Sequence, residues 1–184
     1  MGDSLQIFVH EYLVTGPNVS KPGEGCYLAC TYSTRPVVMV YAREINPPLI
    51  RFLKKLDEAM RNHTDERLGS YLVLFCDSQD YEKKLKALAE KEKIERTLLA
   101  MVVVNESTLA AEAKAGRGGL RGYRAKLAPG AEVAVTLATK DRRVRASYAY
   151  RKGELKDKNV EQILADLPKI FPMRDSRGNR QPPS

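Results

Sequence analysis

The composition of this 184-residue chain fits one folded domain with an ordinary apolar core, since 43% of its residues are hydrophobic. No run of about 18 apolar residues occurs, and the start MGDSLQIFVHEYL lacks the basic and apolar segments of a secretory signal, so we expect no membrane span and no signal. The net charge is +8, and residues 114–152 carry eleven Lys or Arg against two acids, which predicts an anion-attracting surface.

Three cysteines, Cys26, Cys30 and Cys76, are too few for a disulfide scaffold. Together with the start of the chain, this favours a reducing, cytoplasmic setting. We expect no cofactor and no metal, because a zinc site would need His10 or His63 to be recruited from distant segments.

The chain opens with an edge strand predicted within Leu5–Val14 and a loop over Gly16–Gly25. Residues 36–60 follow, PVVMVYAREINPPLIRFLKKLDEAM, and the rest of the chain is organised around them. Val37–Tyr41 is an apolar, β-branched run without alternation, which is typical of a strand buried on both faces of a parallel sheet.

A helix is predicted after this strand, because Asn46 can cap it and Pro47 suits the first helical position, where no N–H is needed. Its apolar stripe comprises Leu49, Leu53, Leu56 and Met60. The opposite, exposed side is expected to carry Lys54, Lys55, Asp57 and Glu58. The loop before the helix faces the carboxyl end of the sheet, where open α/β folds place their sites, and it offers Arg43, Glu44 and Asn46.

The alternation of strand and helix continues along the chain. Tyr71–Phe75 reads as a second buried strand, and a helix is predicted over Tyr81–Lys93 with Ser78 or Asp80 as its cap. Thr97–Val104 is a third β-type run. Alternating strands and helices predict right-handed crossovers and a largely parallel core.

The C-terminal half differs in pattern. A short helix is predicted over residues 107–115, followed by a glycine-rich loop over residues 116–122. Residues 133–137 and 144–150 each alternate between apolar and small or polar side chains around a turn, which predicts an antiparallel hairpin. Asp157 can cap a last helix, and Pro168 ends it or bends it.

This order of elements resembles the thioredoxin-like superfamily, and its peroxiredoxin branch (alkyl hydroperoxide reductase-like) in particular. The segments that carry the resemblance are PVVMVYARE before the first helix, YLVLFCDS, and the hairpin AEVAVTLATKDRRVRASYAYRKGEL. It spans roughly Arg35 to Phe171 and implies an α/β, thioredoxin-like three-layer fold, a mixed central sheet flanked by helices. The chain then divides into an N-terminal extension over 1–35, a thioredoxin-like domain over 36–172 and a disordered polar tail over 173–184.

The catalytic residues of that family are missing from the matching positions. A peroxiredoxin carries its peroxide-reducing Cys in the first turn of the helix after the central strand, where this chain reads Ile45-Asn-Pro-Pro-Leu49. The family's threonine is absent there too, its arginine has no clear counterpart in residues 129–132, and no Cys-x-x-Cys is present in the loop. Without a thiolate nothing attacks an O–O bond or a disulfide, so the resemblance does not imply peroxidase activity.

Cys26 and Cys30 are the remaining candidates for thiol chemistry. Their spacing of four places both sulfurs on one face if the segment is helical, so they can form a reversible disulfide. The alternative is that they are two small apolar fillers, which is how free cysteines often behave. Cys76 ends a buried strand and is expected to belong to the core.

Two polar features have similar alternatives. Arg43, Glu44 and Asn46 either bind a small polar ligand or cap the helix and pair charges at the surface. The basic segment is either a solvated face or the binding surface for a protein partner, which would be acidic. Nucleic acid is not expected, because Arg143 and Arg145 alternate with Tyr148 and Tyr150 on opposite strand faces and leave no stacking platform.

Two hypotheses of function follow. The first is a thioredoxin-like domain without the usual catalytic cysteine that acts as a non-catalytic binding module. The alternative is a non-canonical thiol-redox protein that uses Cys26 and Cys30, which would make it a thiol-dependent oxidoreductase. The sequence leaves open whether the chain is an enzyme.

Overall fold

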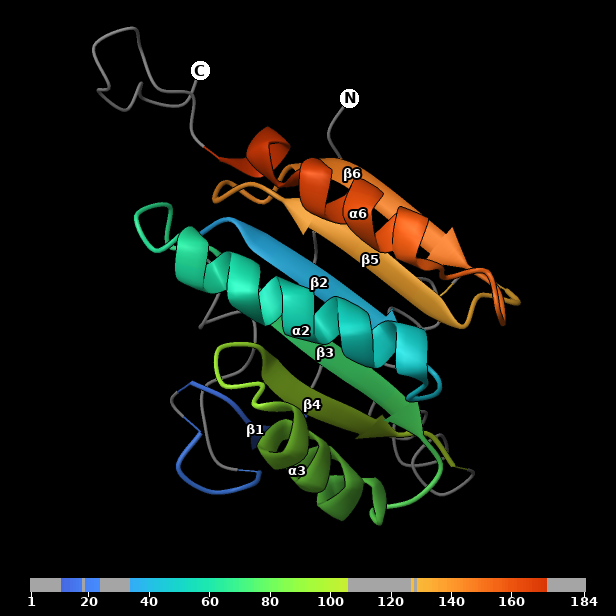
Figure 1. Ribbon diagram of the computed structural model, residues 1–184. Coiled ribbons are helices and arrows are strands. Elements are labelled where there is room, and N and C mark those ends of the chain that lie inside the picture. The colour runs from blue at the N-terminus through green and yellow to red at the C-terminus, as the bar shows by residue number, and fades with distance from the viewer. Residues whose placement is uncertain (1–10, 18, 24–33, 106–126, 128, 172–184) are drawn as a thin grey trace, which may run out of the picture.

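The computed structural model describes residues 11–17, 19–23, 34–105, 127 and 129–171. Within them six strands form one mixed sheet in the order β1-β4-β3-β2-β5-β6 (Figure 1). The strands are β1 (Tyr12–Thr15), β2 (Val37–Ala42), β3 (Gly69–Cys76), β4 (Leu98–Val103), β5 (Val133–Ala138) and β6 (Val144–Tyr150). The helices are α2 (Pro47–Asn62), α3 (Tyr81–Glu92), α6 (Asp157–Ala165) and the short 3-10 helix η1 (Leu167–Ile170).

β2 lies in the middle of the sheet, as the apolar run Val37–Tyr41 predicts, and all of its residues are buried. It pairs in parallel with β3, where Val37 lies opposite Gly69, and antiparallel with β5, where Ala42 lies opposite Val133. β3 pairs in parallel with β4. The carboxyl ends of these three strands therefore meet at one end of the sheet, beside the loop that leads into α2.

The three α-helices cover one face of the sheet (Figure 1). α2 buries its predicted stripe there, and α3 and α6 add Leu85 and Ile163 to the same core cluster. A second cluster of buried residues lies on the opposite face and includes Met39, Tyr41, Tyr71 and Val73, with no contribution from the described helices. Both faces of the central strands are thus buried, which explains why these strands are apolar without alternation.

Asp57 does not lie on the exposed side of α2, so that prediction is wrong. Its side chain is buried, and the residue is only 2% exposed. Oδ1 accepts the backbone N–H groups of Arg96 at 2.7 Å and Thr97 at 2.8 Å, while Oδ2 accepts from Arg61 at 3.2 Å. The carboxylate joins α2 to the segment that enters β4, and a local helical pattern cannot reveal such a distant partner.

The caps predicted for the two later helices agree with the structure only in part. Asp80 is the N-cap residue of α3 but makes no capping bond with its side chain, and Ser78 Oγ accepts the N–H of Asp80 at 3.2 Å. Asp157 is the first residue of α6 rather than its cap. The N–H of Lys156 is instead accepted by Oδ1 of Asn159 at 3.0 Å.

The hairpin β5–β6 is confirmed as antiparallel, with Val133 opposite Tyr150. Its turn is closed by Thr139, whose N–H bonds to the carbonyl of Arg143 at 3.0 Å. The predicted short helix over 107–115, the glycine-rich loop and the polar tail lie outside the described residues. No helix in the described part of the chain has the length and apolar character needed to cross a membrane.

Candidate functional site

The loop between β2 and α2 is held against the start of β5. The backbone N–H of Arg43 donates to the carbonyl of Glu132 at 3.0 Å, and its side-chain Nε donates to the carbonyl of Ala131 at 3.1 Å. The backbone bond continues the antiparallel pairing of β2 with β5 beyond the ends of the strands, and the side-chain bond adds a second connection to the same segment. The guanidinium of Arg43 is therefore engaged with its own chain at the position where this fold places its sites.

Asn46 uses both ends of its side-chain amide. Its Oδ1 accepts the N–H of Leu49 at 3.0 Å and caps α2, which confirms the predicted cap. Its Nδ2 makes a close hydrogen bond to Oε1 of Glu132, a residue that is only 8% exposed. A carboxylate of this chain thus lies beside the positive end of the helix dipole, where negative charge is stabilised.

The first turn of α2 has no backbone N–H available for a ligand. Pro47 and Pro48 occupy the first two helical positions and have no N–H. The next residue, Leu49, donates its N–H to Asn46. A helix N-terminus normally binds anions through these groups, so both the donors and the nucleophile of a thiol site are missing here.

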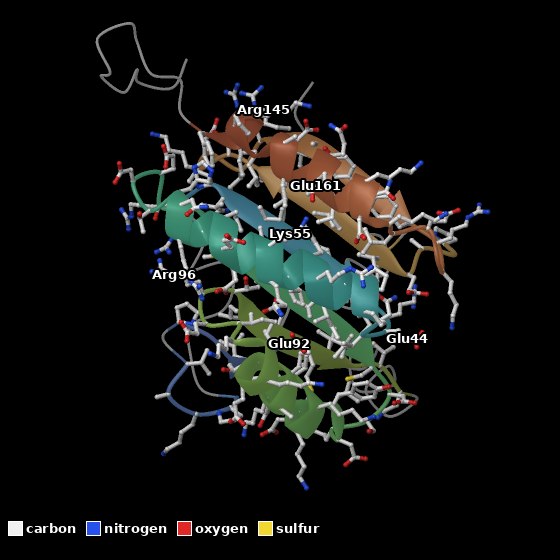
Figure 2. All side chains as sticks on the ribbon, viewed as in Figure 1. Glu44, Lys55, Glu92, Arg96, Arg145 and Glu161 are labelled. Atoms are coloured by element: carbon white, nitrogen blue, oxygen red, sulfur yellow. The ribbon has the colours of Figure 1, made fainter. Side chains whose placement is uncertain are left out.

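Glu44 has a different partner from the other two predicted site residues. It forms an ion pair with Lys152 at 3.3 Å, and both side chains are exposed. Figure 2 shows Glu44 beyond the N-terminal end of α2. Arg43 and Asn46 contact residues 131–132, whereas Glu44 contacts Lys152 after the hairpin, so the three side chains share no common partner. Ligand binding by this trio stays a prediction.

Cys26 and Cys30, the predicted redox pair, lie outside the described residues. Cys76 is buried at the end of β3, and its Sγ donates to the carbonyl of Val102 at 3.7 Å. Burial raises the pKa of the Cys76 thiol, which disfavours the reactive thiolate. Its predicted place in the core is thus confirmed.

The described residues offer little for a metal. His63, one of the two histidines considered for zinc, contacts the ring of Phe171 at a centroid distance of 4.7 Å and pairs with Glu66 at 3.6 Å. Within the described ranges no three His, Cys, Asp or Glu side chains are grouped to hold an ion.

A groove of about 790 Å³ lies between α2 and α3, away from the loop before α2. Charged side chains line it, and two pairs cross it: Lys54 with Glu92 at 2.9 Å and Arg61 with Glu95 at 3.7 Å. Figure 2 shows Lys55 and Glu161 in the corresponding position between α2 and α6. These pairs connect α2 to its neighbouring helices across the surface.

Glu132 is a site residue that was not predicted from the sequence. It follows Pro129-Gly-Ala and precedes the apolar residues of β5, so it stands as a lone acid at the start of a buried strand. That position was a usable signal, since an isolated buried acid needs a partner. The partner, Asn46, is 86 residues earlier and becomes identifiable only from the pairing of β2 with β5.

No family model and no curated protein matches the chain. Solved structures do match. A reduced 2-Cys peroxiredoxin from Plasmodium vivax aligns with a TM-score of 0.57 at 14% identity, covering 91% of this chain and 79% of the other. A cysteine-to-serine mutant of PrxQ from Xylella fastidiosa aligns at 0.55 and 12%, covering 91% and 94%. A putative thiol:disulfide interchange protein DsbE from Chlorobium tepidum gives 0.52 and 12%, covering 90% and 96%.

These likenesses confirm the predicted fold. The chain is an α/β protein with the thioredoxin-like fold of peroxiredoxin and DsbE-type proteins, built on a mixed central sheet. At 12–14% identity the alignment establishes the architecture and says nothing of the chemistry.

Proposed function

We propose that this chain is a thioredoxin-like protein that carries out no thiol chemistry at the N-terminus of α2 and acts as a non-catalytic binding module. The observation that carries the proposal is the first turn of α2, with Pro47, Pro48 and a Leu49 N–H already bonded to Asn46. A peroxide- or disulfide-reducing site needs a thiolate and donors to stabilise it, and this turn offers neither.

The position of Glu132 supports the same conclusion. Its carboxylate bonds to Asn46 and lies close to the helix end that would stabilise a thiolate or a bound anion. A second negative charge brought to this point would be repelled by Glu132. The arrangement therefore serves to fix α2 against β5, which suits a structural connection better than a reaction centre.

A binding role is supported by the charge of the hairpin. Residues 139–152 hold six Lys or Arg and one acid, Asp141, which is a local charge of +5. The cationic side chains are Lys140, Arg142, Arg143, Arg145, Arg151 and Lys152. Such a field favours and accelerates association with an acidic protein partner.

The test is a turnover assay with hydrogen peroxide and with a disulfide substrate, using dithiothreitol as the electron donor. We expect rates equal to those of dithiothreitol alone, for the wild type and for Cys26→Ser and Cys30→Ser alike. Turnover above that background that is lost in either variant would establish the thiol-redox alternative and overturn the proposal. Cys76→Ser serves as a control for its buried thiol.

A further inference from the structure

The outer edge of β6 is a long strand edge with no partner strand among the described residues. β6 is the last strand of the described sheet, and among the described strands it pairs only with β5. It comprises Val144–Tyr150, whereas β1 at the other edge spans four residues and has an irregular register between Leu13 and Thr15. A strand edge presents a row of backbone donors and acceptors, so β6 is the better template for an added strand.

The two faces of β6 differ in chemistry. Arg145, Ser147 and Ala149 are exposed, while Ala146, Tyr148 and Tyr150 are half-buried against the core cluster beneath α6. On that half-buried face the rings of Tyr148 and Tyr150 are parallel, with centroids 6.5 Å apart. A strand added beside β6 would therefore meet apolar rings on one face and Arg145 on the other, and cross-strand neighbours select for complementary side chains.

The cations of the hairpin are mostly available for a partner. Arg143 pairs with Asp141 at 3.0 Å and Lys152 with Glu44 at 3.3 Å. The remaining four form no ion pair with the described residues: Lys140, Arg142, Arg145 and Arg151. Figure 2 shows Arg145 at the β6 side of the molecule, far from α3. The like charges oppose pairing with a second copy of β6 and favour an acidic strand.

From this edge, its two-sided chemistry and its charge, we propose that β6 binds an extended acidic segment of a protein partner by strand addition. The segment alternates acidic residues, which face Arg145, with apolar residues, which face Tyr148 and Tyr150. This inference rests on the proposed binding function and names its surface and its partner. A nucleic acid fits less well, because Tyr148 bonds through its hydroxyl to Asp166 on the half-buried face and offers no exposed ring beside the arginines.

The experiment measures binding of a fluorescein-labelled peptide, as long as β6, in which Glu alternates with Val and Thr. Two further peptides carry N-methyl groups, one on the amides of the Glu residues and the other on the amides between them. In an added strand only one of these two sets of amides faces β6. We expect one N-methylated peptide to lose at least about tenfold in affinity and the other to keep its affinity within about threefold.

Two charge reversals locate the site. Arg145→Glu is expected to weaken the unmodified peptide by about tenfold. Lys83→Glu is the matched control, because Lys83 is exposed on α3 and the change in net charge is the same. The affinity of this variant for the unmodified peptide should stay within about twofold of that of the wild type.

Each other outcome overturns strand addition at β6. In the peptide titrations, these outcomes are no binding by the wild type, equal affinity of both N-methylated peptides, or equal effects of the two charge reversals. Two further measurements have such an outcome: dimerisation through β6 in sedimentation, and displacement of the peptide by single-stranded RNA in a way that depends on Arg145. The turnover assay gives an independent readout. Silent thiols with no peptide binding would overturn this inference alone, whereas cysteine-dependent turnover would overturn the proposed function whatever the peptide does.

Discussion

Asp57 is the most buried carboxylate among the residues that the structure describes, and it connects α2 to the start of β4. Asp57→Ala leaves the N–H groups of Arg96 and Thr97 without their acceptor, one of them fully buried. We expect the free energy of unfolding to fall by about 3 kcal/mol, measured by urea denaturation. Asp57→Asn keeps the accepting oxygen and loses only the pair with half-exposed Arg61, so it should cost about 1 kcal/mol.

The neighbouring exposed acid Glu58 supplies the control. Glu58→Ala should change the free energy of unfolding by less than about 0.5 kcal/mol. A similar loss for Glu58→Ala and Asp57→Ala would contradict the structural role of Asp57. The sequence could not distinguish these two acids, because both occupy positions between the apolar residues of one helical pattern, and only tertiary contact with residues 96–97 separates them.

Between secondary-structure elements, Asn46 connects the end of the β2–α2 loop to the residue before β5. Asn46→Ser keeps a capping oxygen and loses the bond to Glu132, and we expect it to cost about 1–2 kcal/mol of unfolding free energy. Asn46→Asp also keeps a cap but places a second carboxylate beside Glu132, so near neutral pH it should be less stable than the Ser variant. Wild-type stability in Asn46→Asp would show that the bond to Glu132 has no energetic role.

The ion pairs that extend from α2 to its neighbours should contribute much less. Arg51 pairs with Asp157 of α6 at 3.0 Å, and both side chains are at least half exposed. We expect Arg51→Ala to lower the free energy of unfolding by no more than about 1 kcal/mol, and high salt to remove most of that difference. A loss as large as that of Asp57→Ala, or one insensitive to salt, would contradict this.

Local patterns predicted the elements better than the contacts between them. β2, β3, β4 and the hairpin follow from runs of apolar or alternating residues, and Asn46-Pro47 marks the start of α2. The capping bonds of α3 and α6 were predicted less well: Asp80 occupies the N-cap position of α3 without a side-chain capping bond, and Asp157 is the first residue of α6. Ser, Asp and Asn side chains near a helix start have several backbone groups within reach. The contact of Asn46 with Glu132 depends on the register of β2 against β5, which no single segment encodes.

At the scale of the whole molecule, several carboxylates link stability to pH. The pKa of Glu82 is lowered by its hydrogen bond from Lys86 and then by that from Tyr12, and the pKa of Glu92 is lowered by its bond from Lys54. The pKa of Asp166 is lowered by Lys169 and then by Tyr148. These groups bind fewer protons in the folded state than in the unfolded state, so their contribution is present above the ordinary carboxylate range and is lost as pH falls.

We therefore expect the urea concentration at the unfolding midpoint to stay nearly constant between neutral pH and about pH 5 and to decrease steadily below about pH 4. Glu82→Gln should reduce that dependence, because it removes one of the groups that must be protonated. A midpoint that rises on acidification would contradict the directions of these pKa values.

The fold also explains why likeness to redox proteins does not settle the chemistry. The central strand, the helix after it and the hairpin occupy the thioredoxin-like arrangement, while the first turn of that helix contains two prolines and no cysteine. The parallel pairing of β2, β3 and β4 could be anticipated from the alternation of strands and helices, and β1 lies at an edge as predicted. The pairing of β1 with β4 could not be anticipated, since the N-terminal segment has a mixed pattern.

The most direct test of the account is the ultraviolet absorbance of the thiolates of the native protein as a function of pH. We expect no thiol to have a pKa below the ordinary cysteine value of about 8.5. The pKa of Cys76 should lie above that value, because burial raises it. A thiol that ionises below about pH 7, and that disappears from the titration in Cys26→Ser or Cys30→Ser, would show an activated cysteine in this fold and contradict the account.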